Sequence, residues 1–520
     1  MSLVLERRVF PGLAVLWRRC AAAFRDDASP RNPRSWRRSA LKLSAFGGIA
    51  LLGVVWGFVV AVGEVSAVYL CVSLIACVFI LRDFRVGVVL LILLLPISNS
   101  SVFPHAMLGL KGINPVNLLL IGTLVSCLLH GLFDRSQRRF MPRPLLWLYI
   151  VPIVVAGVMG SQHVGEIPSY LFNGPHFENV ASYFRDMVVK PLLMVIFAPL
   201  IGAAVSRSEK PERFLAPALV STWVMVSIVV VFVLLSGASL KELASSESRE
   251  FLSPLGMHAN ELGRLYACAY ALLLFTWAGA KSPGLRLVLL ASIGLVVVAL
   301  VLTFSRGAFL SFILVNVLFL LWRRNAKTLF LFGLLAVCVL FFLPGAVYDR
   351  VMTGFGRGFG SGSNMISAGR VEFIWLPLLP ELPKSPIFGH GLGSILWSEP
   401  MRRGAGVTIL PVGHPHNAYL GALLDMGIAG LILLCAYFIH VWKGLRALSV
   451  DPALSSTLQG FYAGAAAGMA SLLISYITDS SLTPGPEQAF LWLAIGMMYG
   501  QRANGGQRPN GPIRESGRSA

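Results

Sequence analysis

The chain has 520 residues, of which 56% are hydrophobic and 13% are charged, and it carries a formal net charge of +19 at pH 7. A soluble domain has about 25% charged residues, so the composition excludes a single soluble core. It predicts an all-α polytopic membrane protein.

Taken in chain order, most of the apolar runs are long enough to cross a bilayer as helices, which takes about 17–25 residues. We predict about 14 transmembrane helices (12–14), of which the third is short. Their expected ranges are 43–62, 66–81, 86–98, 114–132, 144–161, 188–205, 214–236, 262–280, 285–303, 306–322, 328–345, 426–442, 457–478 and 487–501.

The basic residues predict the orientation of the chain. With the N-terminus in the cytoplasm, about 30 of the 43 lysines and arginines fall on cytoplasmic segments, as the positive-inside rule expects. Both termini are then cytoplasmic, and the net charge faces anionic lipid headgroups. Membrane lipids are therefore the expected partners of the basic surface, and no nucleic-acid partner is needed to explain it.

These patterns divide the chain into five parts. They are a basic cytoplasmic N-terminal segment (1–42), transmembrane helices 1–11 (43–345), a long periplasmic loop (346–415), a periplasmic helix with the last three transmembrane helices (416–501), and a disordered cytoplasmic tail (502–520). Loops as long as 346–415 are usually functional or disordered. We therefore expect chemistry in this loop and in the outer turns beside it.

Arg306 interrupts an apolar stretch in the string 305–308 (SRGA). A charge at membrane depth costs several kcal/mol, and the orientation puts this turn on the outer side. Ser305 is expected to cap the following helix, whose free N–H groups together with Arg306 favour an anion. The alternative is an arginine that reaches the outer headgroups along its aliphatic stem.

Arg370 begins a predicted amphipathic loop helix, with Phe373 and Ile374 on the same side. The other polar strings, at Arg306 and at His416, make Arg370 a candidate functional residue. The alternative is a solvated charge or an ion pair with Glu372 or Glu381.

His416 is expected to begin a helix over 416–426, directly after Pro415. The positive end of the helix dipole favours a neutral imidazole there, and a neutral imidazole accepts a proton or orients a hydroxyl. His414 is expected to point elsewhere. The alternative for His416 is a capping or interfacial histidine.

Other motifs narrow the possibilities. The histidines and carboxylates do not have the spacing of a metal site, so we predict no metal and no cofactor. The glycine-rich string 354–362 (GFGRGFGSG) lacks the ending of a phosphate-binding loop and is interpreted as a hinge. A transporter or flippase remains a more remote alternative, because the spans carry no clear run of charges and no symmetry between halves.

Four strings, in this order, resemble the O-antigen ligase and O-antigen polymerase superfamily over about residues 285–445. They are 303–308 (TFSRGA), 369–375 with its Gly-Arg and Trp, 386–393 (PIFGHGLG), and 414–420 (HPHNAYL) followed by Gly427 and Gly430.

The resemblance implies a C-type membrane glycosyltransferase of the bacterial inner membrane, acting on the periplasmic face without a metal. Its donor is a glycan on undecaprenyl pyrophosphate. The acceptor is lipid A–core in a ligase, which we expect here, and a lipid-linked repeat unit in a polymerase, which is the alternative.

The resemblance and the local chemistry together assign roles to the residues. Arg306 and Arg370 are expected to stabilise the pyrophosphate leaving group, and His416 is expected to activate or orient the acceptor hydroxyl. The expected catalytic residues are thus His416, Arg306 and Arg370. The expected substrate-binding residues are Arg306, Arg370, Asn417, Tyr419 and His414.

Overall fold

The structure is a computed structural model, and it describes part of the chain. The described residues are 53, 57, 65–100, 103–104, 106–107, 110–111, 114–133, 141–167, 177–237, 256–323, 325, 367, 369–402, 410, 412–478 and 482–505. They are largely helical, apart from a two-residue antiparallel hairpin that pairs Ala106 with Lys111 and Met107 with Leu110. Contacts group the chain into Met1–Val78 and Phe79–Ala520, and everything below concerns the second group unless stated.

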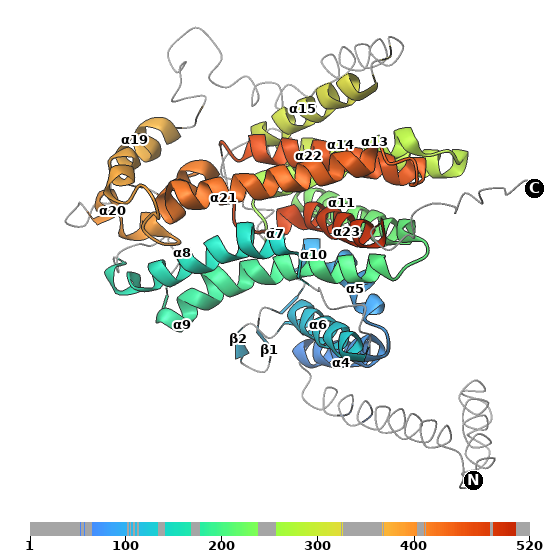
Figure 1. The fold of residues 1–520 in the computed structure, drawn as a ribbon, viewed down its shortest axis with the longest axis horizontal. Helices are drawn as coiled ribbons and strands as arrows, with labels where there is room; N and C mark the ends of the chain where they lie inside the picture. Colours follow the sequence, from blue (N-terminus) through green and yellow to red (C-terminus); the bar gives the residue numbers. More distant parts are fainter. Residues whose placement is uncertain are drawn as a thin grey trace, which may run out of the picture. The chain divides into compact units, whose positions relative to one another are not determined.

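Nearly every predicted span within the described residues coincides with a helix, with ends shifted by a few residues (Figure 1). The spans 43–62, apart from Gly53 and Gly57, and 328–345 lie outside the described residues, as does the string 354–362. The elements are α4 (Val65–Arg82, which crosses the boundary between the two groups), α5 (Phe84–Leu94), η1 (Leu95–Ile97), β1 (Ala106–Met107), β2 (Leu110–Lys111), α6 (Pro115–Phe133), α7 (Arg143–Leu145), η3 (Leu146–Ile150), α8 (Val151–Ser161), η4 (Val164–Glu166), α9 (Val180–Tyr183), η5 (Phe184–Val189), α10 (Lys190–Ser206), η6 (Pro211–Phe214), α11 (Leu215–Ser236), α13 (Ala259–Gly279), α14 (Pro283–Leu302), α15 (Arg306–Arg323), η8 (Val371–Trp375), α19 (Leu376–Leu378), η9 (Leu379–Lys384), η10 (Ser394–Trp397), α20 (Glu399–Arg402), α21 (Ala418–Ser449), α22 (Ser456–Ser475), η11 (Pro486–Gln488) and α23 (Ala489–Gly505).

Length and composition identify eight helical segments in the described part of the chain that are able to cross a membrane. Three shorter apolar helices accompany them, over 68–82, 84–97 and 115–131. The protein is therefore a multi-pass helical membrane protein, as predicted. The total of about 14 spans stays a prediction.

Three π-helical turns share one local cause. In each, the closing N–H comes from the residue before a proline: Val151 donates to Leu146, Lys190 to Arg185, and Leu376 to Val371. A proline ring clashes with the carbonyl four residues earlier, and the wider π turn relieves this contact. One of these turns, η8, directly follows Arg370.

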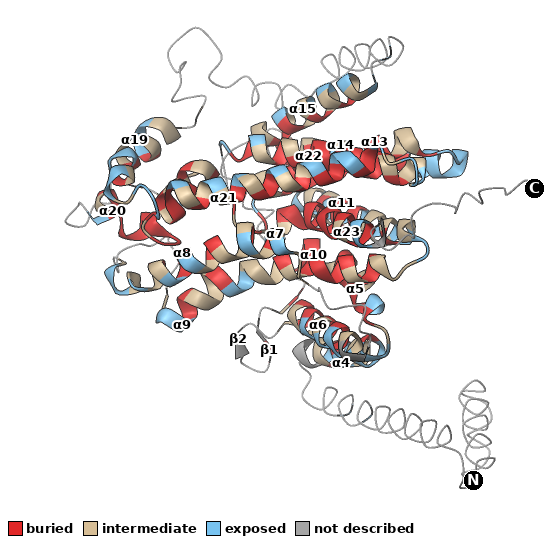
Figure 2. Cartoon of the chain, in the orientation of Figure 1, coloured by how far each residue is buried: buried red, intermediate tan, exposed pale blue. Residues whose placement is uncertain are grey.

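Among the eight candidate spans, the most buried are α13 and α22, which pack closely against each other (Figure 2). Glycines at a spacing of four residues on α22 face α13: Gly460, Gly464 and Gly468. A Cβ added at Gly460 would lie 2.4 Å from the Phe275 carbonyl oxygen. Small residues at this spacing let two helix backbones approach within a membrane. This close packing positions the ends of α13 and α22 that carry the site.

The described part of the long loop packs against the helical bundle. Its buried apolar residues cluster with Tyr183 of α9 and with Leu420 and Leu424 of α21. In Figure 1 the segment with α19 and α20 lies beside the end of α21. The loop residues of this cluster are Ile374, Leu378, Ile395, Leu396, Trp397, Met401 and Leu410.

Candidate functional site

Arg306 is the first residue of α15 and follows a buried turn. The Ser305 side chain donates to Asn260 Oδ1 of α13 (2.8 Å) and accepts from the Ala308 N–H (3.3 Å). The predicted capping role of Ser305 is thus confirmed. Arg306 is half-buried and stands at a helix N-terminus, where backbone N–H groups add to its positive potential.

Arg370 reaches the end of α22. Its Nη1 donates to the Thr478 carbonyl oxygen. In the same helical turn, Trp375 Nε1 donates to the Pro415 carbonyl oxygen (2.9 Å). One short helix therefore joins Arg370 to α22 and also holds the peptide that precedes His416.

The predicted apolar side of this loop helix is only partly correct. Ile374 is buried, whereas Phe373 is 57% exposed. The cause is the π-helical turn at 371–375. Successive side chains point in different directions in a π-helix and in the α-helix on which the prediction was based. Arg370 itself keeps its place at the start of the helix.

The helix predicted to begin at His416 begins at Ala418 instead. Asn417 is its N-cap, and the Asn417 Oδ1 accepts from the N–H groups of Tyr419 (3.1 Å) and Leu420 (3.1 Å). His416 therefore lies before the helix and not in its first turn. The prediction that His414 points elsewhere is also wrong, because the two imidazole rings lie 4.0 Å apart between centroids.

Asn417 and Tyr419 both have structural contacts. Asn417 caps α21, and the Tyr419 hydroxyl donates to the Leu473 carbonyl oxygen of α22 (2.6 Å). These contacts hold the start of α21 against α22, and the Ala418 N–H also donates to the Tyr476 carbonyl oxygen (2.9 Å). Whether either side chain also binds sugar stays a prediction.

Two non-glycine residues in the described part of the chain have positive φ angles, and they lie in the strings 303–308 and 414–420. They are Phe304 (φ 47°), two residues before Arg306, and His416 (φ 49°). This left-handed conformation costs a non-glycine residue on the order of 1–3 kcal/mol and is concentrated at functional sites. Backbone strain therefore points to the same two strings as the sequence does.

The signature segments meet around the end of α22. Ser471 of α22 donates to the Ser311 carbonyl oxygen of α15 (3.4 Å). The two helices run in opposite directions, because α22 is antiparallel to α13 and α13 is parallel to α15. Arg306, at the start of α15, and Tyr476, at the end of α22, each lie five residues from this contact, about 7.5 Å along the helix. Both lie on the same side of the contact. The peptide at 476–478 also contacts Ala418 and Arg370. The ends carrying Arg306, Arg370 and His416 therefore lie at one level of the bundle.

Residues 287–435 match the family model described as O-antigen ligase. This segment is an O-antigen ligase domain. The assignment to the O-antigen ligase superfamily made from the motifs is thereby confirmed. A comparison with curated proteins gives no match.

The ligase domain contains every residue that the sequence analysis proposed for the site, but not all of the surrounding structure. Asn260 and Arg264 of α13 lie outside it, as do Tyr476 and the turn at Glu487. The Arg264 guanidinium lies 5.7 Å from the centre of the Tyr476 ring. Asn260, which lies outside the domain, accepts the hydrogen bond from Ser305 and thus supports the turn before Arg306. The domain indicates a glycosyltransferase-like enzyme.

A cavity of about 420 Å³ opens beside residues 414–416 of the ligase domain, which we call the histidine turn. Its lining includes His414 and Pro415, and it also includes four carboxylates that the sequence analysis missed. These are Asp186, Glu261, Asp425 and Glu487. They come from four separate segments, so no local motif marked them. The sequence did offer one indication of them: acidic residues in or beside apolar spans usually have a function.

In the described part of the chain, the His, Cys, Asp and Glu side chains form no group of three or more that is arranged to hold a metal ion. The carboxylates that line the cavity are able to accept hydrogen bonds from hydroxyl groups.

The string 386–393 of the ligase domain fastens the loop to a bend in α21. The bend is at Gly427, where φ is 63° and ψ is −169°. The His390 N–H donates to the Leu424 carbonyl oxygen (2.8 Å), and the Ile428 N–H donates to the Pro386 carbonyl oxygen (2.9 Å). The bend leaves a short helix before Gly427 and the membrane span after it. The string is thus structural, and it positions the cavity wall.

We expect Gly427→Ala to destabilise the protein by more than about 1 kcal/mol, because alanine is strained at positive φ. The new Cβ would also lie 2.3 Å from the Ile387 carbonyl oxygen. Thermal unfolding of the purified protein measures the effect. Gly294→Ala in α14 is the matched control, since a Cβ there meets no atom within 4 Å. Equal unfolding temperatures for the two variants would contradict the described bend.

Proposed function

We propose that this protein transfers a glycan from undecaprenyl pyrophosphate to an acceptor on the periplasmic face of the bacterial inner membrane. The proposed acceptor is lipid A–core, as in an O-antigen ligase. One observation carries the proposal: two arginines and a strained histidine turn come from separate segments and converge around the end of α22.

The arginines suit the leaving group. When the bond between the sugar C1 and the phosphate oxygen breaks, negative charge grows on the pyrophosphate, and fixed cations stabilise it. Arg306 contributes its charge at the N-terminus of α15. The hydrogen bond from Arg370 to Thr478 fixes one end of its fork and leaves the planar group preorganised.

The histidine turn suits the acceptor. The acceptor hydroxyl oxygen forms the new bond to the sugar C1, and its proton must leave. His416 is the proposed proton acceptor or orienting group, and His414, at 4.0 Å between ring centres, supports it. The products are the extended acceptor and undecaprenyl pyrophosphate.

The cavity beside His414 and the region around Arg306 and Arg370 differ in charge. Among the described residues, the cavity beside His414 is lined by carboxylates, and neither Arg306 nor Arg370 lines it. Asp186 is paired with Arg185 and Lys190. The other three carboxylates of the lining repel a pyrophosphate and accept hydrogen bonds from sugar hydroxyls. The cavity is therefore proposed to hold sugar, with the phosphates on the arginine side.

The surface glycan of a deletion strain tests the function. We expect lipid A–core without polymer, while long polymer still accumulates on the lipid carrier. A core that carries single repeat units would instead assign the protein as a polymerase. A glycan profile identical to that of the parent strain would refute both activities. Complementation with the wild-type gene is the control.

A further inference from the structure

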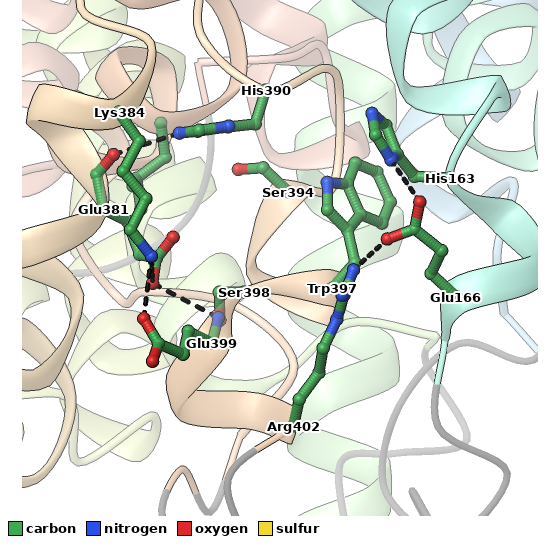
Figure 3. A pocket seen from close by; sticks show the side chains of 11 residues that line it. His163, Glu166, Glu381, Lys384, His390, Ser394, Trp397, Ser398, Glu399 and Arg402 are labelled. Atoms are coloured by element: carbon green, nitrogen blue, oxygen red, sulfur yellow. Dashed lines mark hydrogen bonds and ion pairs between the residues drawn. The ribbon is translucent and has the colours of Figure 1, made fainter.

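A second cavity, of about 320 Å³, lies in the described part of the long loop (Figure 3). This volume is at the lower end of small-molecule sites, which span about 300–1,000 Å³. The turn after α8 forms one side, and the segment from η9 to α20 forms the other. Its polar lining includes His163, Glu381, Lys384, Trp397, Glu399 and Arg402.

The charges around this cavity are paired with one another. Lys384 lies 2.9 Å from both Glu381 and Glu399, and Arg402 pairs with Glu166. The hydrogen bond from His163 lowers the pKa of the Glu166 carboxyl, which is therefore ionised at neutral pH. The lining thus holds three carboxylates against two fixed cations, a balance that disfavours phosphate and suits an uncharged polar ligand.

Trp397 provides an unused hydrogen-bond donor in this cavity. Its side chain is 6% exposed, and the imidazole of His163 stacks on the indole at 5.3 Å with a tilt of 20°. The buried Trp397 Nε1 has no hydrogen-bond partner among the described residues. An indole nitrogen only donates, and a buried donor without an acceptor is unfavourable. A ligand oxygen would satisfy it.

The second cavity adjoins the first. Ser394 and Leu424 line both of them, and the Ser394 hydroxyl donates to Asp425 Oδ1 in the shared wall (2.7 Å). An oligosaccharide that reacts beside His414 thus has a neighbouring cavity available for its next sugar units. Aromatic and polar groups together fit a sugar, which has both C–H faces and hydroxyl groups.

We propose that this second cavity binds an uncharged sugar unit of the substrate glycan next to the reacting unit, with the Trp397 N–H donating to a sugar oxygen. This proposal rests on the proposed function, because it assigns a specificity subsite to the same transfer. The sugar belongs either to the donor glycan or to the acceptor glycan, and both present the same chemistry.

Trp397→Phe tests the subsite, since it removes the N–H and keeps an aromatic ring. In transfer assays with lipid-linked glycan from the host strain and purified lipid A–core, we expect KM to rise about five-fold for one substrate. One hydrogen bond contributes an effect of this size. The value of kcat should stay within about two-fold. Trp147→Phe is the matched control, because Trp147 is 61% exposed on its helix.

A binding measurement keeps this test independent of transfer. Saturation-transfer NMR with glucose, galactose and N-acetylglucosamine as probes should give a signal that Trp397→Phe weakens and Trp147→Phe retains. Glu399→Gln, a change at an exposed ion pair, should weaken the same signal.

Each result then has one meaning. A raised KM for the donor identifies the donor glycan as the occupant, and a raised KM for the acceptor identifies the acceptor glycan. Unchanged KM values together with unchanged NMR signals overturn the subsite. A wild-type protein that binds a sugar through Trp397 but transfers no glycan would overturn the proposed function and leave the subsite standing.

Discussion

Arg306→Lys is expected to lower kcat for glycan transfer by about 10²–10³-fold, the usual cost of removing one preorganised donor from a developing anion. Lysine keeps the charge but loses the planar fork that holds two phosphate oxygens. The measurement is transfer from lipid-linked glycan by the purified variant, with thermal unfolding showing that the fold is intact.

This substitution also separates the two interpretations of Arg306. A lysine reaches lipid headgroups as well as an arginine does, so transfer at the wild-type rate would favour headgroup contact and refute the leaving-group role. Arg323→Lys is the matched control. It makes the same change at the other end of α15, where Arg323 donates to the Ala278 carbonyl oxygen, and transfer should be unaffected.

His416→Asn is expected to lower kcat by about 10²–10⁴-fold, the range for a lost general base. Asparagine is the informative replacement because His416 has a φ angle of 49°. Asparagine tolerates this left-handed conformation, whereas alanine would add strain that mimics a catalytic loss. The assay is the same, and Tm should fall by no more than a few degrees.

The control for this variant is His440→Asn, within α21, the helix that follows His416. It should leave transfer unchanged. If His416→Asn transfers glycan at the wild-type rate, then the histidine only shapes the turn before the Asn417 cap. In that case, the carboxylates of the adjacent cavity become the groups to test as proton acceptors, with Glu261 the first because it lies next to Asn260, which holds Ser305.

The helix start at Asn417 has a consequence for this chemistry. The helix dipole favours a neutral imidazole in the first turn, where the free N–H groups lie, and His416 lies before that turn. The Asn417 side chain accepts hydrogen bonds from two of these N–H groups, those of Tyr419 and Leu420. His416 instead has a left-handed backbone conformation. It is positioned by the adjacent His414 ring and by the hydrogen bond from Trp375 to the Pro415 carbonyl oxygen.

Much of the fold follows from the sequence because a bilayer requires each backbone N–H and C=O group to be paired within the chain. An apolar run of sufficient length must therefore be helical, which is why helices such as α14 and α15 lie within two residues of their predicted ranges. The capping role of Ser305 is equally local, since it depends on a hydroxyl three residues before an N–H.

The arrangement of the site depended on contacts between distant segments. The Arg370 contact with Thr478 spans 108 residues, and the Ser311 contact with Ser471 spans 160. Such contacts depend on which helices pack together and in what register. The apolar pattern cannot report this, because lipid and helix neighbours are equally apolar. By itself, the sequence determined the spans that the described helices match, the polar strings and the superfamily. Only the tertiary structure decided that Asn417 caps α21, that two histidines face each other, and that carboxylates and Trp397 line the adjoining cavities.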